Sequence, residues 1–265
     1  MIALSEKGFK FLKTSGAVKF FATIGEDGWP NVVPLLSATP WDRETVCFVR
    51  FMIWKTRKNL EDRKKVAVCG LGLLSALEVL GEFTGFETSG DKLDFFNSQA
   101  MYRYNAYFGA GQVGVIKVVE EKEWHKASAW RALQAKMLSN AEISGNHEPL
   151  VMPAPVYEKF RRLLGAKFLS WIDDAGWPRL APAPGAFPIS ASKIGVAGFK
   201  DLFSKFETGK LISLSVLSTE PSSFQVKGKF AGMENKSGTS FALIDLEKSF
   251  SCAPPLPGEQ IYPRS

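Results

Sequence analysis

The chain has 265 residues and a formal net charge of +6, with 45% hydrophobic and 23% charged residues. This balance is typical of a folded globular protein and excludes a chain that is disordered throughout. Lysines and arginines are spread along the chain and RNA-binding or zinc-finger motifs are absent, so the sequence predicts no nucleic-acid partner. The most apolar stretch, residues 66–81, is interrupted by glycine, serine and glutamate, and the first residues lack a signal-peptide core. We therefore expect a cytoplasmic protein with no membrane association.

Cysteines and histidines are few. The three cysteines, Cys47, Cys69 and Cys252, have no CxxC spacing, and two of them lie in apolar runs, so we expect reduced thiols in or near the core. The two histidines, His125 and His147, are too isolated to form a convincing metal site. The sequence therefore predicts no bound metal.

The first half of the chain is predicted to open with a short helix at residues 5–16 and a hairpin at 17–34. Asp27 and Gly28 supply the positive-φ turn that a tight hairpin needs. Periodicity then predicts a strand at 46–54, which includes FVRFMIW, and a helix at 56–64. Strands at 66–71 and 79–83 follow, and then helices at 95–111 and 120–138.

The second half repeats the first. Residues 165–182, GAKFLSWIDDAGWPRLAP, match residues 17–34, AVKFFATIGEDGWPNVVP, at a constant offset of 148 with seven identities in 18 positions. Looser matches place 194–197 on 46–49, 214–219 on 66–71, and 226–230 on 79–83. This pattern indicates a duplication, so we expect a mainly β fold with flanking helices, built as two small antiparallel barrels packed as an intrachain pseudo-dimer. The predicted boundaries are 1–138 for the first domain, 139–152 for a linker and 153–265 for the second domain with a proline-rich tail.

A basic cluster lies between the strand that ends at residue 54 and the next buried strand. Thr56 is a natural N-cap for the predicted helix 56–64, and free N–H groups at a helix start attract anions. Arg57 and Lys58 each have an acid four residues on, so exposed helix pairs explain them without a ligand. Lys55, Thr56 and Asn59 remain as a charge, a hydroxyl and an amide for a terminal phosphate, although a solvated helix face explains the same pattern.

The first half resembles the FMN-binding split-barrel superfamily. The resemblance rests on ATIGEDGWPNVVP, then a strand, then KTRKNLEDRKKVAV, then VLGEFTGF, and the K-T-x-x-N segment is its most specific part. It covers most of residues 5–120, with a weaker copy at about 153–250. This superfamily includes pyridoxamine 5′-phosphate oxidase-like proteins, flavin reductases and small bacterial FMN-binding proteins. The resemblance implies six-stranded split barrels, usually homodimeric, with FMN at the subunit interface.

The resemblance also implies which residues contact FMN. It places Lys55, Thr56 and Asn59 at the phosphate. It places a second group near the flavin ring or the ribityl chain, and the members of this group are Val33, Pro34, Leu35, Arg50, Phe51 and Met52. A cation near the ring, Arg50 or another basic residue, would stabilise reduced anionic flavin, and Tyr262 in the tail is a further candidate for a pocket wall.

The second copy departs from this pattern. At the offset of 148, Phe203, Ser204 and Glu207 stand where the first copy has its phosphate set, and a carboxylate would repel a phosphate. We therefore predict one FMN per chain, with the phosphate held by the first half and the ring covered by the second. Lys200 and Lys205 would restore a second site if the alignment slips by a few residues.

Four functions are compatible with these observations. The first is an FMN-dependent oxidoreductase of the pyridoxamine 5′-phosphate oxidase-like class that transfers hydride or electrons through flavin N5, with NAD(P)H as a possible donor, although no residue stands out as a catalytic acid, base or nucleophile. The second is a non-catalytic FMN electron carrier, the third a haem-binding split barrel, and the fourth a pseudo-dimer without cofactor. The corresponding partners are a small-molecule or protein redox partner, and the pseudo-dimer leaves room for further homodimerisation.

Overall fold

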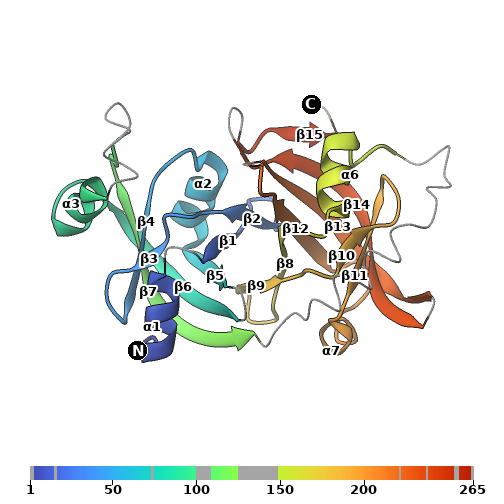
Figure 1. The fold of residues 1–265 in the computed structure, drawn as a ribbon, viewed down its shortest axis with the longest axis horizontal. Coiled ribbons are helices and arrows are strands. Elements are labelled where there is room, and N and C mark those ends of the chain that lie inside the picture. The colour runs from blue at the N-terminus through green and yellow to red at the C-terminus, as the bar shows by residue number, and fades with distance from the viewer. Residues whose placement is uncertain are drawn as a thin grey trace.

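The computed structural model describes residues 3–14, 17–72, 75–99, 109–124, 149–220, 222–236, 238–253 and 257–263. Two antiparallel sheets, one from each half of the chain, lie side by side (Figure 1). Within the described ranges, no helix has both the length and the apolar character that a membrane span requires.

The first half forms a curled sheet with the strand order β2-β1-β5-β6-β7-β4-β3. Its elements are α1 (Glu6–Lys13), β1 (Val18–Ile24), β2 (Pro30–Pro34), β3 (Thr39–Pro40), β4 (Thr45–Val49), α2 (Trp54–Arg63), β5 (Lys65–Leu71), β6 (Ala76–Glu87), α3 (Asp91–Ser98) and β7 (Val113–Trp124).

The second half forms a sheet with the strand order β10-β11-β14-β13-β12-β8-β9, and β15 pairs with β14. Its elements are α6 (Ala154–Arg161), β8 (Ala166–Ile172), β9 (Pro178–Pro182), β10 (Ala186–Pro188), β11 (Lys193–Ala197), α7 (Lys200–Phe203), β12 (Leu211–Leu217), β13 (Ser223–Lys236), β14 (Thr239–Ser251) and β15 (Gln260–Tyr262).

Apart from β15, which pairs with β14 only in the second half, the two sheets have the same topology. This confirms the predicted fold class, a mainly β chain of two tandem split barrels. Each barrel has the six expected strands and a short additional strand at the edge of the sheet, β3 in the first half and β10 in the second.

Strand register corrects one part of the sequence alignment. In the hairpins, Ile24 pairs with Pro30 and Ile172 with Pro178, as the offset of 148 predicts. Phe20 pairs with Cys69, however, whereas its counterpart Phe168 pairs with Ser215, so β5 and β12 are related by an offset of 146. The predicted match of 66–71 with 214–219 is therefore wrong by two residues. The connections differ in length because α7 has four residues and α2 has ten.

Three predicted elements have other boundaries. The strand expected to run to residue 54 ends at Val49, where its pairing with β7 ends, and Met52 turns the chain with a φ of +50°. The helix expected at 120–138 begins instead as strand, because β7 stays paired with β6 as far as Trp124, and its remainder lies outside the described residues. The helix expected at 95–111 is α3, which starts four residues earlier, and residues 100–108 lie outside the described part of the chain.

The two halves pack through equivalent residues. Phe20 of β1 stacks on Phe168 of β8, with ring centroids 4.2 Å apart and an interplanar angle of 22°. Because these residues are counterparts in the repeat, a pseudo-twofold axis passes between the rings. Both rings are fully buried, within a cluster that includes Val32 and Leu180 from the edge strands of the two sheets.

Polar contacts close the same interface. Ser213 Oγ donates to the Pro30 carbonyl at 2.6 Å, and Gln225 Nε2 donates to the Val32 carbonyl at 2.8 Å. Strand β2 is an edge strand of its own sheet, so the second half satisfies backbone acceptors that its own sheet leaves open. The interface thereby fixes how β2 lies against the second repeat.

We predict that Phe168→Ala lowers the free energy of unfolding by about 3–5 kcal/mol, because it leaves a cavity between two fully buried surfaces. Urea unfolding followed by tryptophan fluorescence measures the change. Leu164→Ala is the control, since that side chain is 76% exposed and its loss should be nearly neutral. Equal losses in the two variants would show that the stacked pair does not hold the halves together.

Candidate functional site

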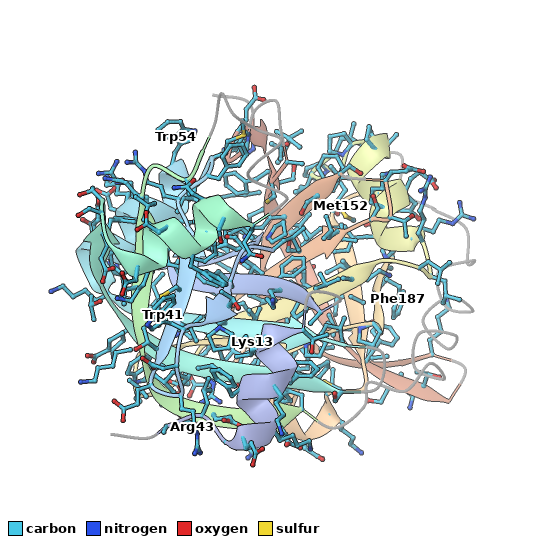
Figure 2. The ribbon with its side chains drawn as sticks, turned by 60° about the vertical axis from the view of Figure 1, so that its left-hand side comes forward. Lys13, Trp41, Arg43, Trp54, Met152 and Phe187 are labelled. Atoms are coloured by element: carbon cyan, nitrogen blue, oxygen red, sulfur yellow. The ribbon has the colours of Figure 1, made fainter. Side chains whose placement is uncertain are left out.

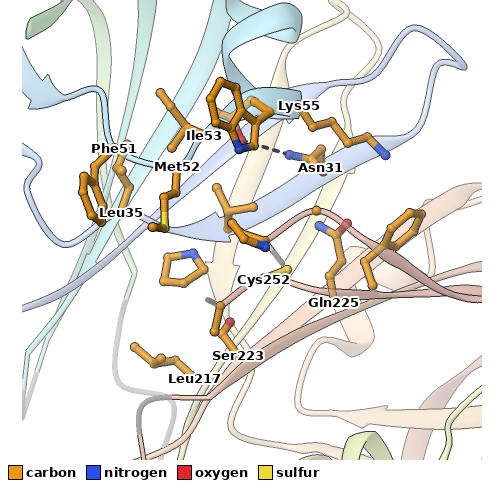
Figure 3. Close-up of a pocket in the computed structure, with 18 of the residues that line it drawn as sticks. Asn31, Leu35, Phe51, Met52, Ile53, Lys55, Leu217, Ser223, Gln225 and Cys252 are labelled. Carbon is orange, nitrogen blue, oxygen red and sulfur yellow. Dashed lines mark hydrogen bonds between the residues drawn. The ribbon is translucent and has the colours of Figure 1, made fainter. Parts of the chain in front are cut away.

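A cavity of about 350 Å³ lies between the two repeats (Figure 3). From the first half it is lined by Asn31, residues 33–37 and residues 51–56. From the second half it is lined by the ends of β12 and β14, the start of β13 and part of the tail, namely Leu217, Ser223, Gln225, Phe250, Cys252, Ala253, Pro257 and Gly258. Its volume falls in the range of small-molecule and cofactor sites.

Most of the residues predicted to contact FMN line this cavity. Val33, Pro34 and Leu35 contribute from β2 and its C-terminal end, and the segment around α2 contributes a second group, consisting of Phe51, Met52, Lys55 and Thr56. Figure 3 shows Lys55 on the first-half side of the cavity and Gln225 and Cys252 on the second-half side.

Two of the predicted contact residues do not line it. Arg50 borders a separate cavity of about 170 Å³, and its guanidinium donates to the side chain of Gln112. Asn59 is buried one turn further along α2, where its amide donates to Thr23 Oγ1 at 2.9 Å. Tyr262 also lies elsewhere, because β15 packs it against the core of the second half.

The start of α2 opens into the cavity. The helix begins at Trp54, and Ile53 occupies the N-cap position without a side-chain hydrogen bond to the helix. Thr56 is therefore the third helical residue and not the predicted N-cap, since the preceding strand ends early and the helix starts two residues sooner. Its buried hydroxyl accepts from Asn31 Nδ2 at 3.4 Å. Because no side chain of the described chain caps the helix, its first N–H groups remain available to a ligand.

Lys55 reaches across to the second half. Its Nζ lies 4.4 Å from the ring centroid of Phe250 in β14. Burial lowers the pKa of Lys55, while the nearby Asp27 carboxylate acts in the opposite direction. The ammonium is thus placed at the junction of the two repeats.

A second lysine lies behind the same ring. Lys227 of β13 is 0% exposed, its Nζ lies 5.4 Å from the Phe250 centroid, and it has no hydrogen-bond partner within the described part of the chain. Burial, followed by the positive charge of Lys55, lowers the pKa of Lys227 to about 7. Sequence reasoning missed this residue, although a lysine in VKGKF at a position where the first copy has an apolar residue was a visible signal.

The position that the pseudo-twofold axis relates to this one has a different set of charges. Register places Leu80 at the position of Lys227, and it places Glu78 at that of Gln225. Arg179 stands at the position of Asn31, and its Nη2 lies 2.8 Å from Glu78 Oε2 and 3.4 Å from Glu120 Oε1. Burial raises the pKa of Glu78, and Arg179 partly offsets this effect. Charge complementarity is thus satisfied there within the chain.

The second helix also lacks the phosphate set. Counted from the first helical residue, Asp201 of α7 occupies the place of Lys55 in α2. Phe203 is buried among aromatic rings of the second core, whereas Ser204 and Glu207 are exposed. Lys200 and Lys205 are exposed as well, so neither restores a buried cation beside α7.

Comparison with known proteins finds no matching family model and no matching curated protein. Similar solved structures include HupZ from Group A Streptococcus, with 21% identity, a TM-score of 0.38, and coverage of 48% of this chain and 96% of that one. An FMN-binding protein from Syntrophomonas wolfei has 16% identity, a TM-score of 0.39, and coverage of 46% and 87%. A NimC/NimA family protein from Clostridium acetobutylicum has 19% identity, a TM-score of 0.36, and coverage of 44% and 84%.

The sheet order and register found in both halves define the class of this fold, a tandem split barrel. It is the fold that the sequence predicts, present twice in one chain. Each of these three similar structures covers less than half of this chain.

We predict that Arg179→Met lowers the free energy of unfolding by about 3–5 kcal/mol at neutral pH, because it leaves the Glu78 carboxylate buried without its partner. The pKa of Glu78, already raised by burial, then rises further. The folded state of the variant therefore binds a proton more readily than the unfolded state, and the loss should shrink as pH falls toward the ordinary carboxyl range.

Urea unfolding at pH 8 and pH 5 measures this difference. The double variant Glu78→Gln with Arg179→Met should recover most of the stability, since a neutral amide still offers an acceptor to the Leu180 N–H that Glu78 bonds at 2.6 Å. A single variant whose loss does not change between the two pH values would contradict the buried-carboxylate explanation.

Proposed function

We propose that the chain binds one FMN in the cavity between its repeats, with the phosphate at the start of α2. The observation that carries this proposal is the composition of the cavity. An uncapped helix N-terminus and the Lys55 ammonium lie along one side of it, and apolar side chains from both repeats form much of the remaining wall. A flavin mononucleotide has the same division into an anionic phosphate and a flat, largely apolar ring.

The residues present fit such a ligand. A phosphate prefers backbone N–H groups at a helix start together with a cation, and Lys55 at the second helical position supplies the cation. The ring prefers apolar contacts with few polar groups, as Val33, Pro34 and Leu35 offer along one wall. The pseudo-equivalent position offers Asp201 and Glu78 instead, which supports one FMN per chain.

We further propose that the protein is an oxidoreductase of the pyridoxamine 5′-phosphate oxidase-like class. FMN, when bound, supplies hydride or electron transfer at its N5 atom. The side chains that line the cavity orient the ring and exclude water. Burial raises the pKa of the Cys252 thiol to about 12, which favours the protonated thiol at neutral pH. The protein thus contributes position and electrostatics to the reaction.

The rim of the cavity supports a second candidate, an electron carrier. Leu36, Phe51, Met52 and Trp54 line the cavity and are exposed large apolar side chains, and Trp54 is 67% exposed at the surface of the molecule (Figure 2). Exposed apolar patches mark interaction sites. The rim is suited to a nicotinamide or other planar substrate in an enzyme, and equally to a protein partner in a carrier.

We predict that the purified protein shows visible flavin absorption and releases one FMN per chain on heating. Lys55→Ala should weaken FMN binding about 10- to 100-fold, because a charge-assisted hydrogen bond contributes about 1.5–3 kcal/mol. Flavin fluorescence titration of the apoprotein measures the affinity. Lys58→Ala is the matched control, since Lys58 lies on the same helix but is exposed and bonds Glu26. Two FMN per chain, or no binding of added FMN, would refute the single asymmetric site.

We also predict that the FMN-loaded protein oxidises NADH or NADPH faster than the same concentration of free FMN does. Absorbance of the nicotinamide, followed under steady-state conditions, measures this rate. A protein whose flavin is reduced by dithionite but by neither nicotinamide would contradict the NAD(P)H-dependent enzyme and favour the carrier.

A further inference from the structure

Lys227 is a buried lysine in a place where the fold alone does not require one. Its ammonium is fully buried and has no carboxylate or carbonyl acceptor among the described residues. A buried charge without a partner is costly, and proteins usually pair such groups or keep them neutral. At the equivalent position of the first repeat, Leu80 fills the same space with an apolar side chain. Folding therefore accommodates an apolar residue here, and the lysine calls for another explanation.

The charged groups around Lys227 form a cluster with a positive balance. Lys55 of α2, Lys248 of β14 and Asp27 of the first hairpin act on it, and Lys248 Nζ lies 3.1 Å from Asp27 Oδ2. The Cys252 thiol also faces the cluster, and burial keeps it protonated. Three ammonium groups and one carboxylate sum to a charge of about +2 when all are ionised, which matches the −1.5 to −2 of a phosphate monoester at neutral pH.

Lys55 and Lys227 both approach the ring of Phe250, which lines the cavity. The Nζ atoms of Lys55 and Lys227 lie 4.4 Å and 5.4 Å from the centroid of Phe250, and Phe250 and Lys55 line the cavity. A cation over an aromatic ring is stabilised only modestly. The cation–π contact with Phe250 is therefore weak, and a stronger interaction with an anion bound beside Lys55 can replace it.

We propose that Lys227 is the second cation of the phosphate site, supplied by the second repeat, and that binding of a phosphate monoester at Lys55 is coupled to uptake of a proton by Lys227. This proposal rests on the proposed function, because the phosphate is that of FMN. It gives the repeat whose own helix has lost the phosphate set an electrostatic part in phosphate binding, from behind the Phe250 ring that lines the cavity. The lysine occurs in the copy that faces α2, whereas the copy that faces α7 has Leu80 and Glu78.

The proton coupling has a definite sign. Without ligand the pKa of Lys227 is about 7, lowered by burial and by Lys55, and a bound dianion raises it. At a pH between the pKa of Lys227 in the free protein and its higher pKa in the complex, Lys227 is protonated in the complex but not in the free protein. FMN affinity should therefore fall as pH rises above about 7, by at most tenfold per pH unit. Ionisation of the phosphate near pH 6 acts in the opposite direction and is complete in that range.

The test compares FMN with riboflavin, which has the same ring but no phosphate. Dissociation constants are measured by flavin fluorescence at pH 7 and pH 9 for the full-length wild type and for Lys227→Met. We expect the variant to bind FMN about 10- to 100-fold more weakly, to bind riboflavin unchanged, and to lose most of the pH dependence of FMN binding. Its apoprotein should melt no lower than the wild type, since a buried charge has been removed.

Lys229→Met is the matched control. Lys229 lies two residues further along β13, is about half exposed and pairs with Glu247 at 2.7 Å. Its removal should leave both dissociation constants and their pH dependence at the wild-type values.

Two outcomes of the flavin titrations would overturn the proposal. Lys227→Met should lose the wild-type preference for FMN over riboflavin, so retention of that preference overturns the proposal. Equal weakening of the binding of both flavins overturns it as well, because it shows a merely structural role.

If the wild type binds neither flavin, the proposed function fails. Thermal unfolding in inorganic phosphate, compared with chloride at equal ionic strength, then tests whether Lys227 belongs to an anion site. Stabilisation by phosphate in the wild type but not in Lys227→Met supports the anion site, and its absence in the wild type or its equality in both overturns it.

Discussion

The packing of Phe20 on Phe168 is the contact on which the rest of this structure depends. It brings two copies of one split barrel together about a pseudo-twofold axis, and it does so with residues that are counterparts in the repeat. The cavity exists only because of this arrangement, since its walls come from β2 and α2 on one side and from β12, β13 and β14 on the other. Neither half encloses the cavity alone.

Covalent linkage of the copies removes the requirement that both interface positions be equal. In a homodimer a substitution appears at both symmetry-related sites. Here Gln225 lines the cavity and Lys227 approaches the same Phe250 ring as Lys55, whereas Leu80 and Glu78 occupy the related positions, where Glu78 pairs with Arg179. The position beside α2 therefore has more lysines than carboxylates. At the related position, Glu78 and Arg179 neutralise each other within the chain. The duplication has let one position become a ligand site and the other a structural ion pair.

Sequence reasoning recovered the parts of the fold that depend on local patterns. The repeated hairpins, with Gly28 and Gly176 at φ values of 77° and 74°, follow from turn chemistry that neighbouring residues decide. It misplaced the start of α2, because the apolar run 48–54 does not show where pairing with β7 ends. It also predicted Arg50 near the flavin ring, and in the structure this side chain bonds Gln112 and borders a neighbouring cavity that shares Met52, Ile53 and Trp54 with the first.

The sequence by itself determined the duplication and the mainly β class, since identities and alternation are properties of contiguous residues, and its resemblance to the split-barrel superfamily supplied the expectation that Lys55 and Thr56 lie near β2. Only the tertiary structure decided that Lys227 and Phe250 meet Lys55, and that Glu78 takes Arg179 as its partner. These residues are separated by about a hundred positions or more along the chain. Their contacts depend on strand register and on the angle at which two barrels pack, and neither quantity is encoded in any local pattern.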